Sequence, residues 1–546
     1  MYIDTAYSIQ NSKAYVRHLL RDSYRENGQV KHRTIANLSH CSEAEIAAMK
    51  LALKHKGNLV DLGSLAEAEI KYGMRIGAIF TLKTLANRVG LSSALGATGP
   101  GRLALWQVLA VLMGQGSRLK SVRLAESHAA CDILGLEAFN EDNLYVNLAW
   151  LAAQQETIEK RLFRQRYPNS PPQLFLYDVT SSYLEGVQNI LAAFGYNRDG
   201  KKGKMQIVIG LLTGPEGTPV AVRVFAGNTA DTGTVVEQIR ILASSFGVEQ
   251  ITLVGDRGML KQTQIGQLQA KQFHYITAIT KPQIRTLLRE GVFQIGLFEE
   301  KLCEVACEKV RYILRRNPER AQEVALSREA KLAKVKELVT AKNQYLSEHP
   351  RAKVTIAERE IGGKIKVFQI EDWVKVVSQG KVLDLVMNEE ALRKLAELDG
   401  CYVIKTDVPA DVATAEVIHE RYKDLAQVEK AFRTFKNGHL KVQPTFVRTE
   451  ASTRGHVFVI MLAYLLEREL ARYWRTLEVT VAEGLDELGS LRGIEIGEGK
   501  VSYQRVPAAT DLSKQLLEAA NIQLPTILPL RKVRVATRKK LVKERI

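Results

Sequence analysis

The chain has 546 residues, of which 46% are hydrophobic and 25% are charged, as in globular proteins with room for several domains. Its formal net charge of +17 favours a nucleic acid or an anionic membrane surface as partner, although a merely basic enzyme remains an alternative. No apolar run is long enough to span a bilayer. The five cysteines are scattered and odd in number, which argues against a disulfide framework.

The first region, residues 1–65, is predicted to contain a β-hairpin over residues 14–38, because Asn27-Gly28 is a strong turn signal between two strand-like runs. The strands carry many basic side chains, which suit either a DNA-contacting ribbon or a solvated edge. The first residues lack the layout of a secretion signal, so we expect a cytoplasmic protein without a membrane partner.

Residues 66–170 are predicted to be helical and to form a candidate DNA-binding domain. The segment 81–96 has the cadence of a helix-turn-helix unit, with Gly90 at the turn. Such matches also arise by chance, so a plain helical hairpin is the alternative.

Residues 171–284 change to three successive strands followed by helix, strand, helix and strand, an order that favours a mixed sheet covered by helices. We expect residues 285–395 to be an insertion with a hairpin around Gly362-Gly363, and residues 396–480 to resume the α/β pattern. The C-terminal region, residues 481–546, ends in a basic tail.

Three acidic residues suit a metal-dependent phosphodiester enzyme. Asp178 and Asp256 each follow an apolar run, and Glu429 lies in a predicted helix. Two strand-end carboxylates and one helix carboxylate can hold a pair of divalent cations for attack on a phosphate. Asp231 also follows a strand, and we expect it to cap the next helix or to orient the site. Each carboxylate taken alone is equally compatible with an ordinary turn or helix surface.

The segment 419–436 is predicted to be one amphipathic helix with an apolar stripe. Tyr422, Glu429 and Lys436 are seven residues apart, so their side chains align on one flank of that stripe, with Arg433 beside Glu429. There the carboxylate can meet the strand-end carboxylates, while Lys436 and Arg433 can meet phosphate oxygens. The alternative is an ordinary helix with its charges in solvent.

These motifs carry a resemblance to a known family. YDVTSSYLEG, VGDRGM and the series Tyr422-x2-Leu425-x3-Glu429-x6-Lys436 resemble the DDE transposases of bacterial insertion sequences, in the branch with a Tyr-x2-Arg-x3-Glu-x6-Lys signature. The segments SYRENGQVKHRTIANLS and HLKVQPTFVRTEASTRGHVFVIMLAYLL also resemble this family. One departure is Leu425, which replaces the family arginine on the apolar stripe. Arg433 and Arg421 are the candidates to substitute for it.

The resemblance implies an α/β fold with an RNase H-like mixed-sheet core, interrupted by a β-containing insertion, with a helical N-terminal DNA-binding region. It implies two Mg²⁺ or Mn²⁺ ions held by Asp178, Asp256 and Glu429 as catalytic residues, with Tyr422 and Arg257 supporting them or binding DNA phosphate together with Arg433 and Lys436. The partners would be double-stranded DNA, namely terminal inverted repeats and target, and a second subunit in a homodimer at the bacterial nucleoid. The alternatives are a non-catalytic DNA-binding protein derived from a transposase, and a metal-dependent nuclease without strand transfer.

Overall fold

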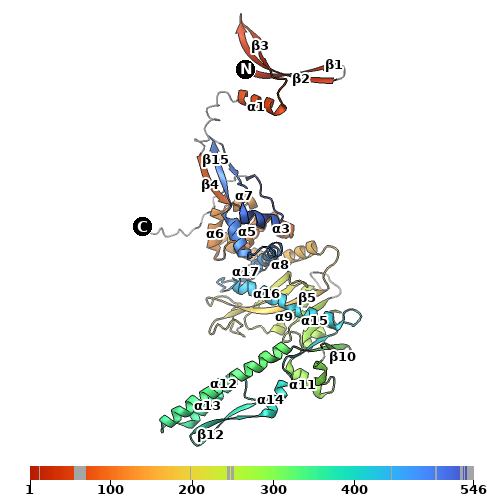
Figure 1. Cartoon of the computed structure of the whole chain (residues 1–546), viewed down its shortest axis with the longest axis vertical. Coiled ribbons are helices and arrows are strands. Elements are labelled where there is room, and N and C mark those ends of the chain that lie inside the picture. The colour runs from red at the N-terminus through yellow and green to blue at the C-terminus, as the bar shows by residue number, and fades with distance from the viewer. Residues whose placement is uncertain are drawn as a thin grey trace. The chain divides into compact units, whose positions relative to one another are not determined.

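A computed structural model describes residues 1–10, 13–54, 69–196, 198–242, 246, 251–299, 301–438, 440–443, 445–498 and 501–528, and also 533, 535 and 537 (Figure 1). The chain divides into two compact units. The first comprises residues 1–73, 493–506 and 526–528, and the second comprises residues 74–492, 507–525 and 529–546. Most of the basic tail, 531–546, lies outside the described residues.

The first unit confirms the predicted hairpin and adds strands to it. An antiparallel sheet consists of β1 (Tyr2–Gln10), β2 (Lys13–Glu26) and β3 (Gln29–Asn37), and α1 (Glu43–Lys54) follows. Asn27 and Gly28, at the β2–β3 turn, have φ angles of 50° and 78°, as a two-residue hairpin turn requires. The unit also contains most of a second sheet, which was not predicted and has the strands β4 (Glu69–Arg75), β15 (Arg492–Glu498), β16 (Val501–Arg505) and β17 (Ile527–Leu528).

The second unit begins with the predicted helices and includes three more from the C-terminal half. They are α3 (Gly77–Arg88), α4 (Leu91–Leu95), α5 (Gly99–Met113), α6 (Arg118–Ser127), α7 (Ala130–Leu134), α8 (Glu141–Arg166), α17 (Glu450–Tyr473), α18 (Val481–Ser490) and α19 (Asp511–Ala519). Gly90 has a φ of 79° between α3 and α4, as a tight turn requires. Because α3 is mostly buried and α4 has only five residues, the structure favours the plain helical hairpin over a DNA-reading unit.

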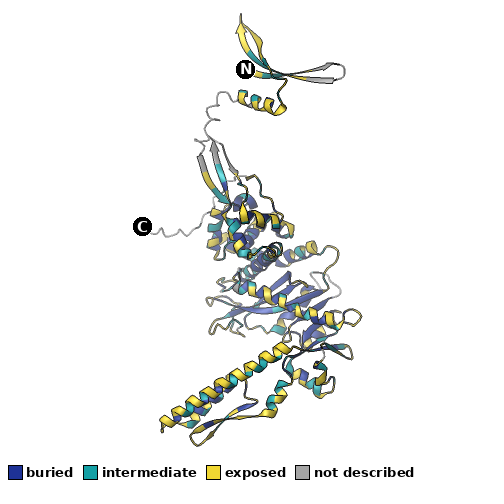
Figure 2. Cartoon of the chain, in the orientation of Figure 1, coloured by how far each residue is buried: buried dark blue, intermediate teal, exposed yellow. Residues whose placement is uncertain are grey.

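An eight-stranded mixed sheet forms the centre of this unit, with strand order β10-β11-β14-β9-β8-β5-β6-β7. Its strands are β5 (Leu174–Tyr183), β6 (Gln206–Thr213), β7 (Pro219–Ala226), β8 (Thr252–Gly255), β9 (His274–Ala278), β10 (Cys303–Cys307), β11 (Val310–Arg316) and β14 (Cys401–Thr406). Helices α9 (Asp231–Ile241) and α10 (Gln262–Gln269) alternate with β8 and β9, which confirms the predicted order. Figure 2 shows that buried residues concentrate in this sheet.

The chain leaves the sheet after β9 and returns to it at β14, which pairs with β9. Between them, β10 and β11 extend the sheet, and the remaining elements are α11 (Lys281–Arg289), the short 3-10 helix Ile295–Phe298, α12 (Pro318–Glu348), α13 (Val354–Phe368), β12 (Val374–Gln379), β13 (Val382–Met387) and α14 (Glu389–Ala396). A separate apolar cluster of α12, α13, β12 and β13 stabilises the outer part of this segment.

The hairpin predicted around Gly362-Gly363 is wrong, because both glycines lie inside α13. Ala357, Ile361 and Ile365 are buried at a spacing of four residues, which is a helical period rather than the period of two of a strand. The hairpin of this region is β12–β13, farther along the chain.

No disulfide bond joins any of the five cysteines, all of which lie among the described residues. Among the described residues, no helix is both long and apolar enough to cross a membrane.

Candidate active site

Sheet register places the first two carboxylates side by side. β5 and β8 are parallel, and Tyr177 lies opposite Gly255. Asp178 and Asp256 follow these two residues directly, so they occupy neighbouring positions on chains about 4.8 Å apart.

Asp256 follows the last residue of β8, as predicted, but the expectation that Asp178 ends its strand is wrong. β5 continues to Tyr183 because β6 pairs with it along this stretch. On the opposite side of β5, however, the parallel partner β8 ends at Gly255. Asp178 therefore lies just past the last residue of β5 that pairs with β8. This leaves one side of the carboxylate open to other groups.

The third carboxylate comes from a pair of helices rather than from the single predicted helix. α15 (Ala415–Lys423) carries Tyr422, and α16 (Leu425–Asn437) carries Glu429. The division falls at Asp424, where the Gln427 N–H donates to the Asp424 carbonyl over 2.8 Å, a tighter turn than the α-helical one.

The predicted apolar stripe is confirmed. Its members are all buried, namely Leu425, Val428, Phe432 and Phe435. α16 packs against β5 and β6, and Glu429 is exposed at the border of this packed face. The stripe thus attaches the helix carboxylate to the sheet that carries the other two.

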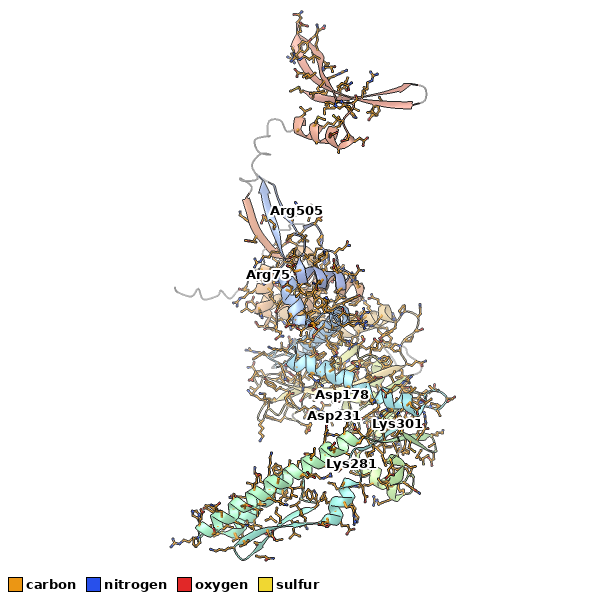
Figure 3. The ribbon with its side chains drawn as sticks, in the orientation of Figure 1. Arg75, Asp178, Asp231, Lys281, Lys301 and Arg505 are labelled. Atoms are coloured by element: carbon orange, nitrogen blue, oxygen red, sulfur yellow. The ribbon has the colours of Figure 1, made fainter. Side chains whose placement is uncertain are left out.

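All three carboxylates line one pocket of about 410 Å³. Tyr422, Arg257 and Leu425 also line it. Figure 3 labels Asp178 on the sheet close to the helices α15 and α16. Side chains more than 70 residues apart in sequence therefore meet around a single space.

The carboxylates of Asp256 and Glu429 add negative charge around Asp178, which is half-buried. Burial raises the pKa of Asp178 to about 7, and the charges of Asp256 and Glu429 act in the same direction. The backbone N–H of Val179, which donates to Asp178 Oδ1 over 2.7 Å, and the charge of Arg198 oppose this rise. A cation placed among the three carboxylates would relieve the repulsion that remains.

Tyr422 links α15 to the sheet. Its hydroxyl donates to Asp256 Oδ1 over 3.3 Å, and the backbone N–H of Arg257 donates to the same oxygen over 2.8 Å. Burial raises the pKa of Tyr422, and the adjacent Asp256 charge raises it further, so the phenol stays a hydrogen-bond donor at neutral pH. Two donors thus hold the exposed carboxylate of Asp256 in place.

Comparison with known families identifies the chain. The family described as "Transposase DDE domain" matches residues 169–466, which is more than half of the chain and includes all three carboxylates. The chain belongs to the DDE transposases. The family described as "IS1634 family transposase, N-terminal domain" matches residues 3–61, which confirms the predicted resemblance to insertion-sequence enzymes. As a transposase, the protein cleaves DNA and transfers strands.

Other comparisons add less. No curated protein matches the transposase. Among solved structures, a piggyBac transposase synaptic complex with hairpin DNA is similar, with 8% sequence identity, a TM-score of 0.35, and coverage of 71% of this chain and 69% of that chain.

The chemistry of the donors fits divalent metal ions, because Mg²⁺ and Mn²⁺ prefer oxygen ligands and the pocket offers three carboxylates. Within the described part of the transposase, no group of three or more His, Cys, Asp or Glu side chains is arranged so that it could hold a metal as it stands.

Two of the predicted basic residues lie elsewhere than in the pocket lining. Lys436 forms a buried ion pair with Asp199, with 2.6 Å between Nζ and Oδ1, and Arg433 is exposed on α16. Neither Arg433 nor Arg421 takes the place of the family arginine in the pocket lining, where Leu425 itself lies.

The pocket has other cations that the motifs did not indicate. Arg257, Lys281 and Lys423 line it, and Figure 3 labels Lys281 at the start of α11. Lys423 is in the predicted helix but off the seven-residue series, and Lys281 follows a strand with no flanking signature. Only contacts made by the folded chain distinguish them from other surface lysines.

Asp231 does not cap α9, so the first of the two roles expected for it is wrong. It is the first residue of that helix, Ala230 occupies the cap position, and no side chain caps the end. The Asp231 carboxylate instead pairs with Arg198 over 2.5 Å. Since Arg198 lowers the pKa of Asp178, Asp231 acts on the site through its partner.

Proposed function

We propose that Asp178, Asp256 and Glu429 are the catalytic carboxylates of this transposase and that they hold two Mg²⁺ or Mn²⁺ ions. The observation that carries this proposal is that all three line one pocket within the matched family span. When bound, the two metals would supply the positive charge that activates water or a 3′-hydroxyl and stabilises the leaving oxygen.

The protein's own groups prepare this site for a DNA strand. The Tyr422 hydroxyl and the Arg257 backbone N–H orient the Asp256 carboxylate. The side chains of Arg257, Lys281 and Lys423 place positive charge in the pocket, where it can attract the phosphate on either side of the scissile bond. Arg433 extends this charge along the exposed face of α16, whereas Lys436, through Asp199, positions that helix.

The core is proposed to be RNase H-like, formed by residues 171–284 and 396–480. The antiparallel series β7-β6-β5, continued by the parallel strands β8 and β9, supports this proposal, as does the return of β14 to β9. Residues 285–395 would be the insertion, with 1–65 and 66–170 as the N-terminal regions and 481–546 as the C-terminal region.

The substrates are proposed to be the inverted repeats at the two ends of the element, followed by target DNA in the cytoplasm. The net charge of +17 supports a polyanionic partner. Because two ends must be joined to one target, we propose a homodimer as the active complex.

The test uses double-stranded DNA that carries the element's own ends, found as inverted repeats on either side of the gene. We expect Mg²⁺-dependent cleavage at the ends and joined products when target DNA is added. Cleavage without joined products would favour a nuclease. Binding without cleavage, in Mg²⁺ or in Mn²⁺, would overturn the assignment of the carboxylates.

A further inference from the structure

Asp399 joins the catalytic pocket to the insertion. The residue is 4% exposed and lies two positions before β14, the strand whose Cys401 and Tyr402 line the pocket. Its carboxylate pairs with two cations from different elements, Lys281 on α11 and Arg328 on α12. One buried anion is therefore shared between a cation that lines the pocket and a cation of the insertion.

The backbone around Asp399 is held against the start of α12. The Arg316 Nε donates to the Asp399 carbonyl over 3.2 Å, and the Asn317 N–H donates to the Gly400 carbonyl over 2.9 Å. Gly400 has a φ of 72°, and a β-carbon there would lie 2.2 Å from the Asn317 carbonyl oxygen, so this close approach requires glycine. The turn that carries Asp399 is thus fixed without any contribution from Lys281.

The two oxygens of the Asp399 carboxylate meet different cations. The Arg328 Nη2 donates to Oδ2. The Lys281 Nζ lies 3.7 Å from Oδ1, which is close enough for an ion pair but too far for a hydrogen bond. Within the described part of the chain, no group donates a hydrogen bond to this buried Oδ1. Because such an oxygen is costly to bury, it attracts the nearby ammonium group.

Lys281 is consequently placed by Asp399 and can still bind substrate. Its side chain is 40% exposed and lines the catalytic pocket. A lysine of this exposure has a flexible four-carbon stem and would occupy many rotamers without an anion beside it. Since its contact with Oδ1 is an ion pair and not a hydrogen bond, the ammonium group keeps N–H donors for a phosphate oxygen.

We propose that Asp399 is a positioning residue that holds the Lys281 ammonium group at the catalytic pocket, where it binds a phosphate of the DNA strand. Because Arg328 pairs with the same carboxylate, the position of Lys281 also depends on α12 of the insertion. This inference rests on the proposed function, since Lys281 meets DNA only when the strand enters that pocket.

The test is a double-mutant cycle of Asp399→Asn and Lys281→Ala in the full-length protein, on DNA that carries the element's ends. Each single variant should cleave about 10-fold more slowly in Mg²⁺, as the loss of one charged hydrogen bond predicts. The double variant should be no slower than Lys281→Ala, because both changes remove the same contact. Losses that multiply to about 100-fold in the double variant would overturn the proposal.

The salt dependence of DNA binding provides a readout that a purely structural role would not change. It is measured without divalent metal, so that no cleavage occurs. Lys281→Ala and Asp399→Asn should each make the plot of log Kd against log salt concentration less steep by about 0.9, the value for one phosphate contact. An unchanged slope in Asp399→Asn would overturn the proposal.

A further variant separates positioning from folding. Asp399→Asn leaves the charge of Arg328, whose side chain is 13% exposed, without this carboxylate and should lower the melting temperature. Asp399→Asn combined with Arg328→Met removes both charges and should restore the melting temperature, whereas cleavage should stay as slow as in Asp399→Asn. Full recovery of cleavage together with stability would show that Asp399 acts only on folding.

Asp407→Asn is the matched control, because it makes the same change at the other end of the same strand. Asp407 directly follows β14, its side chain is 10% exposed, and its carboxylate accepts a hydrogen bond from the Tyr275 N–H over 3.0 Å. Neither residue lines the catalytic pocket, so cleavage and the salt slope should match the wild type. Losses equal to those of Asp399→Asn would contradict a specific role for Asp399.

Asp256→Asn distinguishes a failure of this inference from a failure of the proposed function. A less steep salt slope in Asp399→Asn, together with normal cleavage by Asp256→Asn, would overturn the catalytic assignment alone. An unchanged slope in Asp399→Asn, together with loss of cleavage in Asp256→Asn, would overturn the positioning role alone. A less steep slope and loss of cleavage, each in its own variant, would support both.

Discussion

The two sheet carboxylates and the helix carboxylate differ in what holds them in place. Asp178 and Asp256 stand on parallel strands whose relative position is set by backbone hydrogen bonds. Glu429 depends instead on the buried stripe of α16 and on the ion pair between Lys436 and Asp199. A register shift would break several ladder hydrogen bonds at once, whereas a packed helix can move by small side-chain adjustments.

This difference shows which part of the site is preformed. The sheet delivers two adjacent carboxylates regardless of what α16 does. Glu429 reaches the same pocket through the packing of α16 against the sheet. Variants of this site can show whether the sheet carboxylates and the helix carboxylate contribute separately and what connects them.

The largest effect is expected from removing either kind of carboxylate. Asp256→Asn and Glu429→Gln should each lower the rate of end cleavage at least about 1000-fold, equivalent to about 4 kcal/mol in the barrier, because each would remove one of the proposed metal ligands. Gel assays with Mg²⁺ measure this loss, and DNA binding should survive because it comes from many phosphate contacts.

The control for Glu429 is Glu420→Gln. Glu420 is exposed on α15, outside the pocket lining, and pairs with Lys423 over 2.9 Å, so its loss should leave cleavage within about twofold, as exposed pairs contribute little. If Glu429→Gln cleaved as fast as Glu420→Gln while Asp256→Asn was inactive, the helix carboxylate would have no catalytic role.

The second-largest effect is expected from breaking the ion pair between Lys436 and Asp199, which holds α16 in place. The side chains of Lys436 and Asp199 are 11% and 8% exposed, so Lys436→Met would leave the Asp199 charge buried without this cation. We expect a loss of about 3 kcal/mol in the free energy of unfolding, measured by denaturant titration, and a fall in cleavage as α16 loosens. Lys204→Met is the comparison, because its pair with Glu185 is exposed and should contribute less than about 1 kcal/mol. Equal stability losses in the two variants would contradict the anchoring role.

The third-largest effect is expected in how the stability of the folded protein depends on pH and on added metal. Folding raises the pKa of Asp178 from 3.8 to about 7, so folding favours the protonated carboxyl group. The folded protein therefore loses stability as pH rises through 7 and this group ionises. Without metal, Asp178→Asn should therefore raise the free energy of unfolding at pH 8 by about 1–3 kcal/mol and change it little at pH 4. Thermal unfolding at the two pH values measures this.

Glu467→Gln provides the control, because burial alone raises the pKa of Glu467 to about 7 and no carboxylate of the pocket adds to it. Both variants should be stabilised at pH 8 without metal. Added Mg²⁺ should raise the melting temperature of the wild type and of Glu467→Gln by about 2 °C, but not that of Asp178→Asn. A full Mg²⁺ response in Asp178→Asn would place the metal elsewhere.

The contrast between sheet and helix also explains what could be predicted from sequence. The strands of the core are short apolar runs between turn signals, so their order was predictable, and so was the position of Asp256 directly after one of them. The pairing with β6 that carries β5 past Asp178 was not predictable, because it depends on a neighbouring strand. The break between α15 and α16 was not predictable, because the backbone at Asp424 stays close to helical, with a φ of −60° and a ψ of −17°. Lys281 and Arg198 could not be found either, since Lys281 meets the carboxylates only in the lining of the folded pocket and Arg198 pairs with Asp231, about 30 residues away in sequence.

The smallest effect is expected at the link between the two kinds of carboxylate. Tyr422→Phe removes the hydroxyl that donates to Asp256 Oδ1 over 3.3 Å, and the Arg257 N–H remains as a donor to the same oxygen. Cleavage should fall about fivefold, as expected for one net hydrogen bond of about 1 kcal/mol, with folding unchanged. Tyr183→Phe, at the end of the strand that carries Asp178 but outside the pocket lining, should cleave normally. If Tyr422→Phe lost as much activity as Glu429→Gln, the phenol would be a reacting group rather than a positioning one, and α15 would contribute to the chemistry as directly as α16.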